Sequence, residues 1–180
     1  MKKELLALLA LVSGISLAAD LSPYAGEELR SLKSISAQEI ESLRSGGGMG
    51  FAKLAELNHY PGPKHVLELA AELGLTPSQV SETEALFEEM RSMAVVLGED
   101  LIDAETALDG KFSQGAISAN SLQSALLDIG RIRAQLRFVH LEAHLRQKQI
   151  LTPEQVANYD ETRGYLGEAR DHAGHSEGHN

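Results

Sequence analysis

Apolar side chains recur every three or four residues along most of the chain, which predicts helices rather than strands. The pattern is longest and most regular over 77–108 and 119–149. The apolar positions of the first segment are Leu86, Met90, Met93, Leu97, Leu101, Ala104 and Leu108. Those of the second are Leu122, Ala125, Ile129, Ile132, Leu136, Val139 and Ala143. One apolar seam on each helix predicts that the two pack together as a hairpin, connected by 109–115.

The region before the hairpin predicts shorter helices. Residues 25–43 carry helical periodicity with a break before Ser36, and Ser36 and Glu39 have the spacing of a capping box. The glycine-rich run 45–50 then interrupts the helix, most simply as a flexible hinge.

Two more short helices are predicted, over 51–57 and 64–73, separated by the proline-containing turn 59–63. Gly74 stands where a left-handed residue ends a helix. Because no alternating strand of useful length occurs, the sequence predicts an all-α fold.

One six-residue pattern occurs twice, at 75–80 and 151–156, with five of six positions identical. In each copy Thr is the N-cap, Pro is the first helical residue, Gln at the third position reaches back to the cap, and the preceding Leu packs on the following Val. The residues that define the pattern are Leu75, Thr76 and Gln79 in the first copy and Leu151, Thr152 and Gln155 in the second. Each copy predicts a sharp turn between antiparallel helices.

The second long helix carries more apolar surface than one seam needs. The additional residues are Leu126, Phe138, Leu141 and Leu145. One interpretation is that the shorter helices pack on them. The other is that they form a dimer interface or an exposed surface for client proteins.

The first 18 residues have the outline of a signal peptide, with a basic start, a short apolar run and small residues before the expected cleavage after Ala18. Ala19 is the second choice for the cleavage position. The alternative is an uncleaved anchor, but the apolar run is shorter than the roughly 20 residues of a membrane span. We therefore expect export to the periplasm, a linker with the start of a helix over 19–35, and no stable membrane insertion.

The formal net charge is −10, and removal of the signal segment would make it one unit more negative. Such a surface repels nucleic acid and anionic lipid and favours cations, including metal ions. The chain has no cysteine, so a metal site must use His, Asp or Glu. No nucleophile elbow and no phosphate-binding loop after a strand is present, so we expect neither an enzyme nor an organic cofactor.

His140 and His144 are one helical turn apart on the second long helix, so both imidazoles can reach one ion. His65 or Glu68, on one face of a short helix, are the candidates for a third ligand. The alternative is that the pair only flanks the seam within a solvated polar stripe. The string is not that of a zinc protease, because Glu142 points away from the pair.

The end of the chain, 167–180, is predicted to be a flexible tail. It contains His172, His175 and His179 beside acidic residues, a composition that suits Zn, Ni or Cu. The alternative is a tail that only aids solubility.

Over 36–166 the chain resembles the Spy/CpxP superfamily of periplasmic proteins, which includes the zinc-associated ZraP and the metal-sensor domain CnrX. The resemblance rests on the repeated Leu-Thr-x-x-Gln at 75–79 and 151–155, which flanks the long hairpin. The segment 55–69 and the His140, His144 spacing are similar to a heavy-metal branch of that superfamily. The resemblance implies a four-helix protomer paired as an antiparallel homodimer that holds unfolded proteins without ATP.

These observations predict a periplasmic stress protein that binds Zn, Ni, Cu or Co and holds unfolded clients. The alternative is a metal sensor or accessory subunit of a resistance system that acts on a membrane sensor protein. A purely structural helical module is the third possibility.

Overall fold

The computed structural model describes residues 22–165, and this part of the chain is helical and contains no strand. The predicted signal segment 1–18 and the predicted tail 167–180 lie outside the described residues. Within them the elements are the 3-10 turn Glu27–Leu29 and the helices α1 (Ala37–Ser45), α2 (Lys53–Glu56), α3 (Pro63–Glu68), α4 (Pro77–Ser113), α5 (Ala119–Ile150) and α6 (Pro153–Thr162). The predicted all-α class is confirmed.

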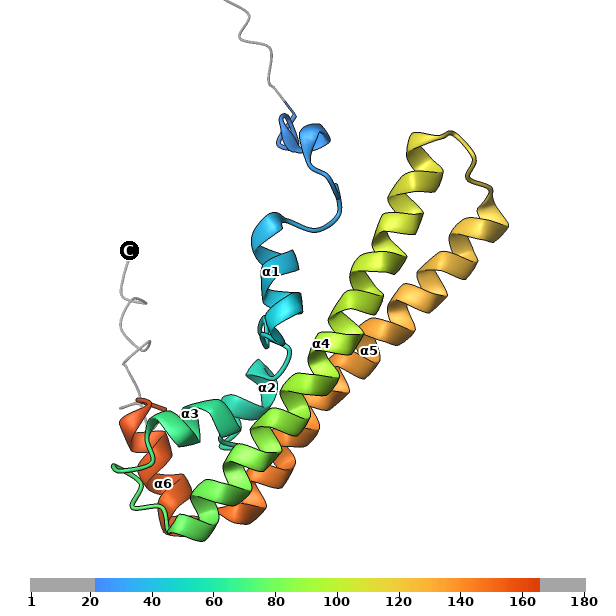
Figure 1. Cartoon of the computed structure of the whole chain (residues 1–180). Coiled ribbons are helices and arrows are strands. Elements are labelled where there is room, and N and C mark those ends of the chain that lie inside the picture. The colour runs from blue at the N-terminus through green and yellow to red at the C-terminus, as the bar shows by residue number, and fades with distance from the viewer. Residues whose placement is uncertain (1–21, 166–180) are drawn as a thin grey trace, which may run out of the picture.

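Helices α4 and α5 lie side by side over most of their length, with α3 and α6 at one end of this pair and α1 beside its middle (Figure 1). Helix α4 is longer than predicted, because it continues through Asp109 and Gly110 instead of ending before them. Asp109 is held by Lys33, with 3.1 Å between Oδ2 and Nζ. The helix ends only at Gln114, followed by Gly115 with φ +64°. A single glycine in a helix costs only about 1 kcal/mol, which the surrounding helix tolerates.

The predicted seam of α5 is buried from Ile129 to Ala143, but the predicted seam of α4 is partly wrong. Met93 is 46% exposed, and Ala94 and Gly98 are buried instead. The reason is α1, which packs closely on this face of α4. A Cβ atom on Gly98 would lie 2.6 Å from the carbonyl oxygen of Leu43, so only glycine permits this approach.

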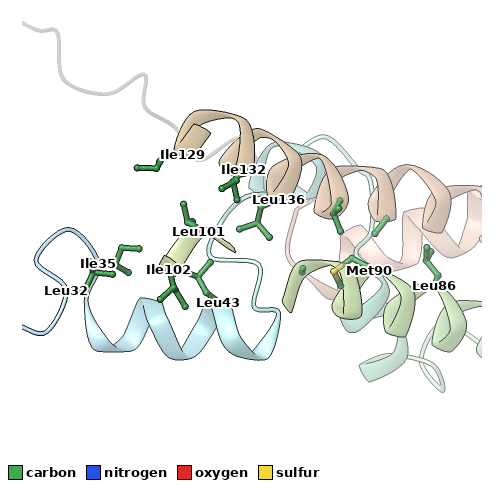
Figure 2. Close-up of a cluster of buried hydrophobic side chains, with 13 residues drawn as sticks. Leu32, Ile35, Leu43, Leu86, Met90, Leu101, Ile102, Ile129, Ile132 and Leu136 are labelled. Atoms are coloured by element: carbon green, nitrogen blue, oxygen red, sulfur yellow. The ribbon is translucent and has the colours of Figure 1, made fainter. Parts of the chain in front are cut away.

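Helix α1 and the segment before it cover the middle of the hairpin. Figure 2 shows Leu32, Ile35 and Leu43 beside Leu101 and Ile102 of α4, all of them buried. Helix α1 begins at Ser36 with the predicted capping box. Burial of apolar side chains at about 25 cal/mol per Å² is the main force that holds α1 in place.

The two copies of the repeated motif both form the predicted capping boxes, at Thr76 with Gln79 and at Thr152 with Gln155. The two glutamines also meet each other, because each amide nitrogen donates to the other side-chain oxygen, at 2.7 and 3.1 Å. The Gln79 amide in addition donates to the carbonyl of Ile150 at 2.9 Å. The two helix starts therefore form one joint, although they are 76 residues apart.

A second, smaller core closes this end of the hairpin. Its buried members are Val66 of α3, Leu73, Leu151 and Tyr159 of α6. Gly74 has the predicted left-handed conformation, with φ +59°, but the predicted helix 64–73 is too long, because α3 ends at Glu68 and turns follow up to Gly74. Helices α3 and α6 are thereby fixed beside the joint (Figure 1).

Three of the four additional apolar residues of α5 stay exposed in the described protomer. Leu126, Phe138 and Leu145 are 52%, 59% and 51% exposed, whereas Leu141 is half-buried. The described short helices therefore do not cover most of this surface. In the described range, none of the helices combines the length and the apolar character that a membrane crossing requires.

Candidate functional site

A cavity of about 730 Å³ lies between the glycine-rich loop, α2, α3, the first half of α4 and the second half of α5. This volume is within the usual range of small-ligand sites. The titratable side chains that line it include Glu56, His65, His140, His144 and Tyr165. Three of the seven sequence-predicted metal ligands thus lie around one cavity.

Gly62 keeps space open for one imidazole, and Gly48 lies beside the other. A Cβ atom on Gly62 would lie 2.9 Å from Nε2 of His144, which is closer than a side chain permits. Gly48 approaches His140, with 3.8 Å from its Cβ position to Nδ1. The glycine-rich loop is therefore a wall of the cavity as well as a connection between α1 and α2.

His144 is held in one orientation by the backbone. Its Nδ1–H donates to the carbonyl oxygen of Tyr60 at 2.7 Å. Because a carbonyl only accepts, the neutral ring carries its proton on Nδ1 and leaves the lone pair of Nε2 free. A second hydrogen bond of this kind is how proteins orient histidines that ligate metals.

His140 is 5% exposed and stacks on Phe51 with 5.8 Å between ring centroids. Its Nε2 is buried and has no hydrogen-bond partner. Burial, and in addition the positive charge of His144 when protonated, lower the pKa of His140 to about 4. The ring is therefore neutral at pH 7, which is the form that binds metals.

Glu56 is the site residue that the sequence did not reveal. Its Oε1 accepts hydrogen bonds from the hydroxyl groups of Tyr159 and Tyr165, the latter at 3.0 Å. Its Oε2 is buried without a hydrogen-bond partner and lies 3.7 Å from Nδ1 of His144. Burial and the Glu56 carboxylate raise the pKa of Tyr159. The only sequence signal is an acid within the apolar segment 51–57, and nothing there indicates tyrosines more than a hundred residues away.

His65 and Glu68 contact each other, with 2.8 Å between Nδ1 and Oε2. The hydrogen bond from His65 lowers the pKa of Glu68. His65 lines the cavity, whereas Glu68 is not part of its lining and its side chain is 52% exposed.

Within residues 22–165, no three His, Asp or Glu side chains come together as a group that could hold a metal ion. His172, His175 and His179 lie outside the described residues. The pair His140 and His144 is therefore placed at a cavity, and metal binding stays a prediction.

A second hollow of about 510 Å³ lies between α4 and α5. Its apolar lining consists of Met93, Val96, Leu97, Phe138 and Val139. Val96 and Phe138 are 62% and 59% exposed. We call these five residues the apolar groove.

Comparison with known protein families, with curated proteins and with solved structures gives no match. The resemblance to the Spy/CpxP superfamily therefore rests on the repeated motif and the hairpin alone and stays a prediction.

Proposed function

We propose that this protein is a periplasmic stress protein of Spy/CpxP type that binds one divalent transition-metal ion, Zn, Ni, Cu or Co, in the cavity lined by His140 and His144. The main observation in support of a metal site is the pair His140 and His144. The two rings follow one another on α5, line one cavity, and each has an imidazole nitrogen without a hydrogen bond to the described part of the chain. Imidazole is a preferred ligand of these metals.

The surroundings of the pair suit a cation. The backbone carbonyl of Tyr60 fixes the ring of His144. Burial keeps His140 neutral, so this ring need not lose a proton at pH 7 to bind a metal ion. The Glu56 carboxylate supplies negative charge inside the cavity. A buried nitrogen and a buried carboxylate oxygen without partners are costly, and a bound ion reduces that cost.

Calorimetric titration with Zn²⁺ and Ni²⁺ tests this proposal. We expect one ion per chain and a loss of affinity of at least tenfold in the variant His140→Ala with His144→Ala. The matched control is His59→Asn, which changes a histidine that pairs with Asp160 and does not line the cavity. If the double variant binds both metals as tightly as the parent, the site is elsewhere.

The contacts of Glu56 favour the alternative function, a metal sensor. This carboxylate joins the cavity to Tyr159 on α6 and to Tyr165 beyond it. A metal ion near Glu56 would therefore alter the surroundings of both tyrosines. The chain has four tyrosines and no tryptophan, so near-ultraviolet circular dichroism reports on them directly. A sensor predicts a metal-dependent spectrum that Tyr159→Phe reduces, and an unchanged spectrum at saturating metal contradicts it.

The apolar groove supports the second part of the proposal, the holding of unfolded proteins, and is also a surface on which a second copy could pack. The variant Val96→Ser with Phe138→Ser should no longer suppress aggregation of an unfolded test protein at a near-stoichiometric ratio. The matched control is Leu127→Ser, because Leu127 is 69% exposed and does not line the groove. Equal suppression by all three proteins, or none by the parent, contradicts client holding at this groove.

A further inference from the structure

The cavity that contains His140 and His144 is far larger than one metal ion requires. Its volume is about 730 Å³, whereas a water molecule takes up about 30 Å³ in the liquid. Cavities of roughly 300–1,000 Å³ are typical of sites for small organic molecules. If the proposed metal site is correct, on which this inference rests, the cavity has room for the ion and for a small molecule bound to it.

The imidazole donors lie on one wall of the cavity, which α5 forms. His140 is 5% exposed, and its Nε2 has no hydrogen-bond partner. Within residues 22–165, no further His, Asp or Glu joins the pair in a group of three that could hold a metal ion. Zinc in proteins usually has four ligands. An ion held by His140 and His144 therefore keeps coordination positions open toward the rest of the cavity.

The opposite side of the cavity carries basic side chains. Lys53 of α2, Lys64 of α3 and Arg91 of α4 belong to its lining. All three residues are exposed, whereas His140 is buried. The positive charges therefore lie nearer to solvent than the imidazoles, and they come from three different helices. We call these three residues the basic rim.

Acidic residues neutralise the basic rim only in part. Glu68 lies 3.9 Å from Lys64, between Oε1 and Nζ, and Glu88 lies 3.2 Å from Arg91, between Oε2 and Nη1. Neither glutamate belongs to the lining, in which Glu56 is the one acid among the described residues. Positive charge at the rim attracts anions and repels a bare divalent cation. The buried wall of the cavity thus suits a metal ion, and its exposed wall suits an anion.

We propose that the cavity binds its metal ion as a complex with a small di- or tricarboxylate. His140 and His144 bind the ion, and carboxylate oxygens occupy further coordination positions on it. The remaining carboxylate oxygens contact the basic rim. Such a complex carries a net negative charge, so the rim attracts it. Neither a bare ion nor the organic anion alone makes both sets of contacts.

Equilibrium dialysis with Ni²⁺ and radiolabelled citrate tests this proposal on the full chain. From an equimolar mixture, the parent should retain one Ni²⁺ and one citrate per chain. Without Ni²⁺ it should retain at least tenfold less citrate, because the rim alone does not hold the anion. Retention of both components shows that the protein binds the complex instead of competing with citrate for the ion.

Three variants assign the contacts. They are a helix variant (His140→Ala, His144→Ala), a rim variant (Lys53→Gln, Lys64→Gln, Arg91→Gln) and a control variant (Arg30→Gln, Arg131→Gln, Arg137→Gln), which removes the same charge from exposed residues outside the lining. The helix variant should lose retention of Ni²⁺ and of citrate. The rim variant should bind citrate at least tenfold more weakly in the presence of Ni²⁺. It should bind Ni²⁺ alone at least as tightly as the parent, because three repelling charges are removed. The control variant should match the parent in both.

The outcomes separate this inference from the proposed metal site. If the parent binds no Ni²⁺, or the helix variant binds it like the parent, the proposed metal site fails and this inference fails with it. If the parent binds Ni²⁺ alone but citrate removes the ion without being retained, the metal site stands and the carboxylate complex is overturned. Citrate retention that does not require Ni²⁺, or that the rim variant shares with the parent, also overturns it.

Discussion

Two glycines within the long helices have opposite surroundings. A Cβ atom on Gly98 of α4 would lie 2.6 Å from the carbonyl oxygen of Leu43, whereas one on Gly130 of α5 would have no atom within 4 Å. Alanine stabilises a helix by about 1 kcal/mol relative to glycine. A Gly→Ala substitution should show this preference alone at Gly130, and at Gly98 the preference together with the steric clash.

We therefore predict that Gly98→Ala lowers the free energy of unfolding by about 1–2 kcal/mol, because the displacement of α1 outweighs the helix preference. Gly130→Ala, the control, should raise it by up to about 1 kcal/mol. Urea unfolding monitored by circular dichroism measures both. Equal stabilisation by the two substitutions would show that α1 does not pack on α4 as described.

Burial of His140 gives a prediction about pH. Its folded pKa of about 4 lies below the ordinary value of 6.5, so between these values the unfolded chain binds a proton that the folded chain does not. Stability from this residue is therefore present above pH 6.5 and is lost as the pH falls toward 4.

Between pH 7 and pH 5, in the presence of a chelator, His140 should contribute a loss of about 2 kcal/mol in the free energy of unfolding. Urea unfolding at both pH values measures the loss, and His140→Phe is the comparison because its ring does not titrate. The parent should lose more than the variant over this range. The same loss in both proteins would mean that His140 is accessible to protons in the folded chain.

At the scale of elements, the joint links two helix starts that the sequence presents as separate. Gln79 and Gln155 each complete a capping box and also bond to each other. By contrast, the capping box of α5 at Ser118 and Ser121 contains only bonds within its own turn.

We predict that Gln79→Ala and Gln155→Ala each lower the free energy of unfolding by about 1–2 kcal/mol. The double variant should lose less than the sum, by at least about 0.5 kcal/mol, because either substitution already breaks the shared amide pair. Ser121→Ala should cost only about 0.5–1 kcal/mol and add fully to either one. Strict additivity of the two glutamine substitutions in urea unfolding would argue against a shared joint.

The sequence predicted the helices well where local signals agree. Both Thr-Pro starts and the Ser36 capping box are formed, because caps depend on residues within one turn. The end of α4 was predicted too early, since Gly110 is only a weak helix breaker and the distant Lys33 holds Asp109. The predicted burial of Met93 was wrong for a similar reason, because it also depends on a contact distant in sequence. The close contact between Gly98 and Leu43 determines which face of α4 is covered by α1, and Met93 is not on that face.

At the scale of the whole molecule, the sequence indicated part of the candidate site. The spacing of His140 and His144 places both on one side of α5, and His65 lies at the same cavity. Glu56 was missed because its partners, Tyr159 and Tyr165, come from the far end of the chain. Such pairings arise only when the joint brings α6 beside α2 and α3, which no local pattern encodes.

Histidine nitrogen resonances give the most direct test of the central proposal, that His140 and His144 bind a metal ion. In a ¹⁵N NMR titration with Zn²⁺, an imidazole nitrogen of His140 and Nε2 of His144 should move to positions typical of metal-bound rings. Nδ1 of His144 should keep its proton, because it donates to Tyr60. His59, which pairs with Asp160, should not change. Unchanged resonances of His140 and His144 at saturating Zn²⁺ would contradict the proposal.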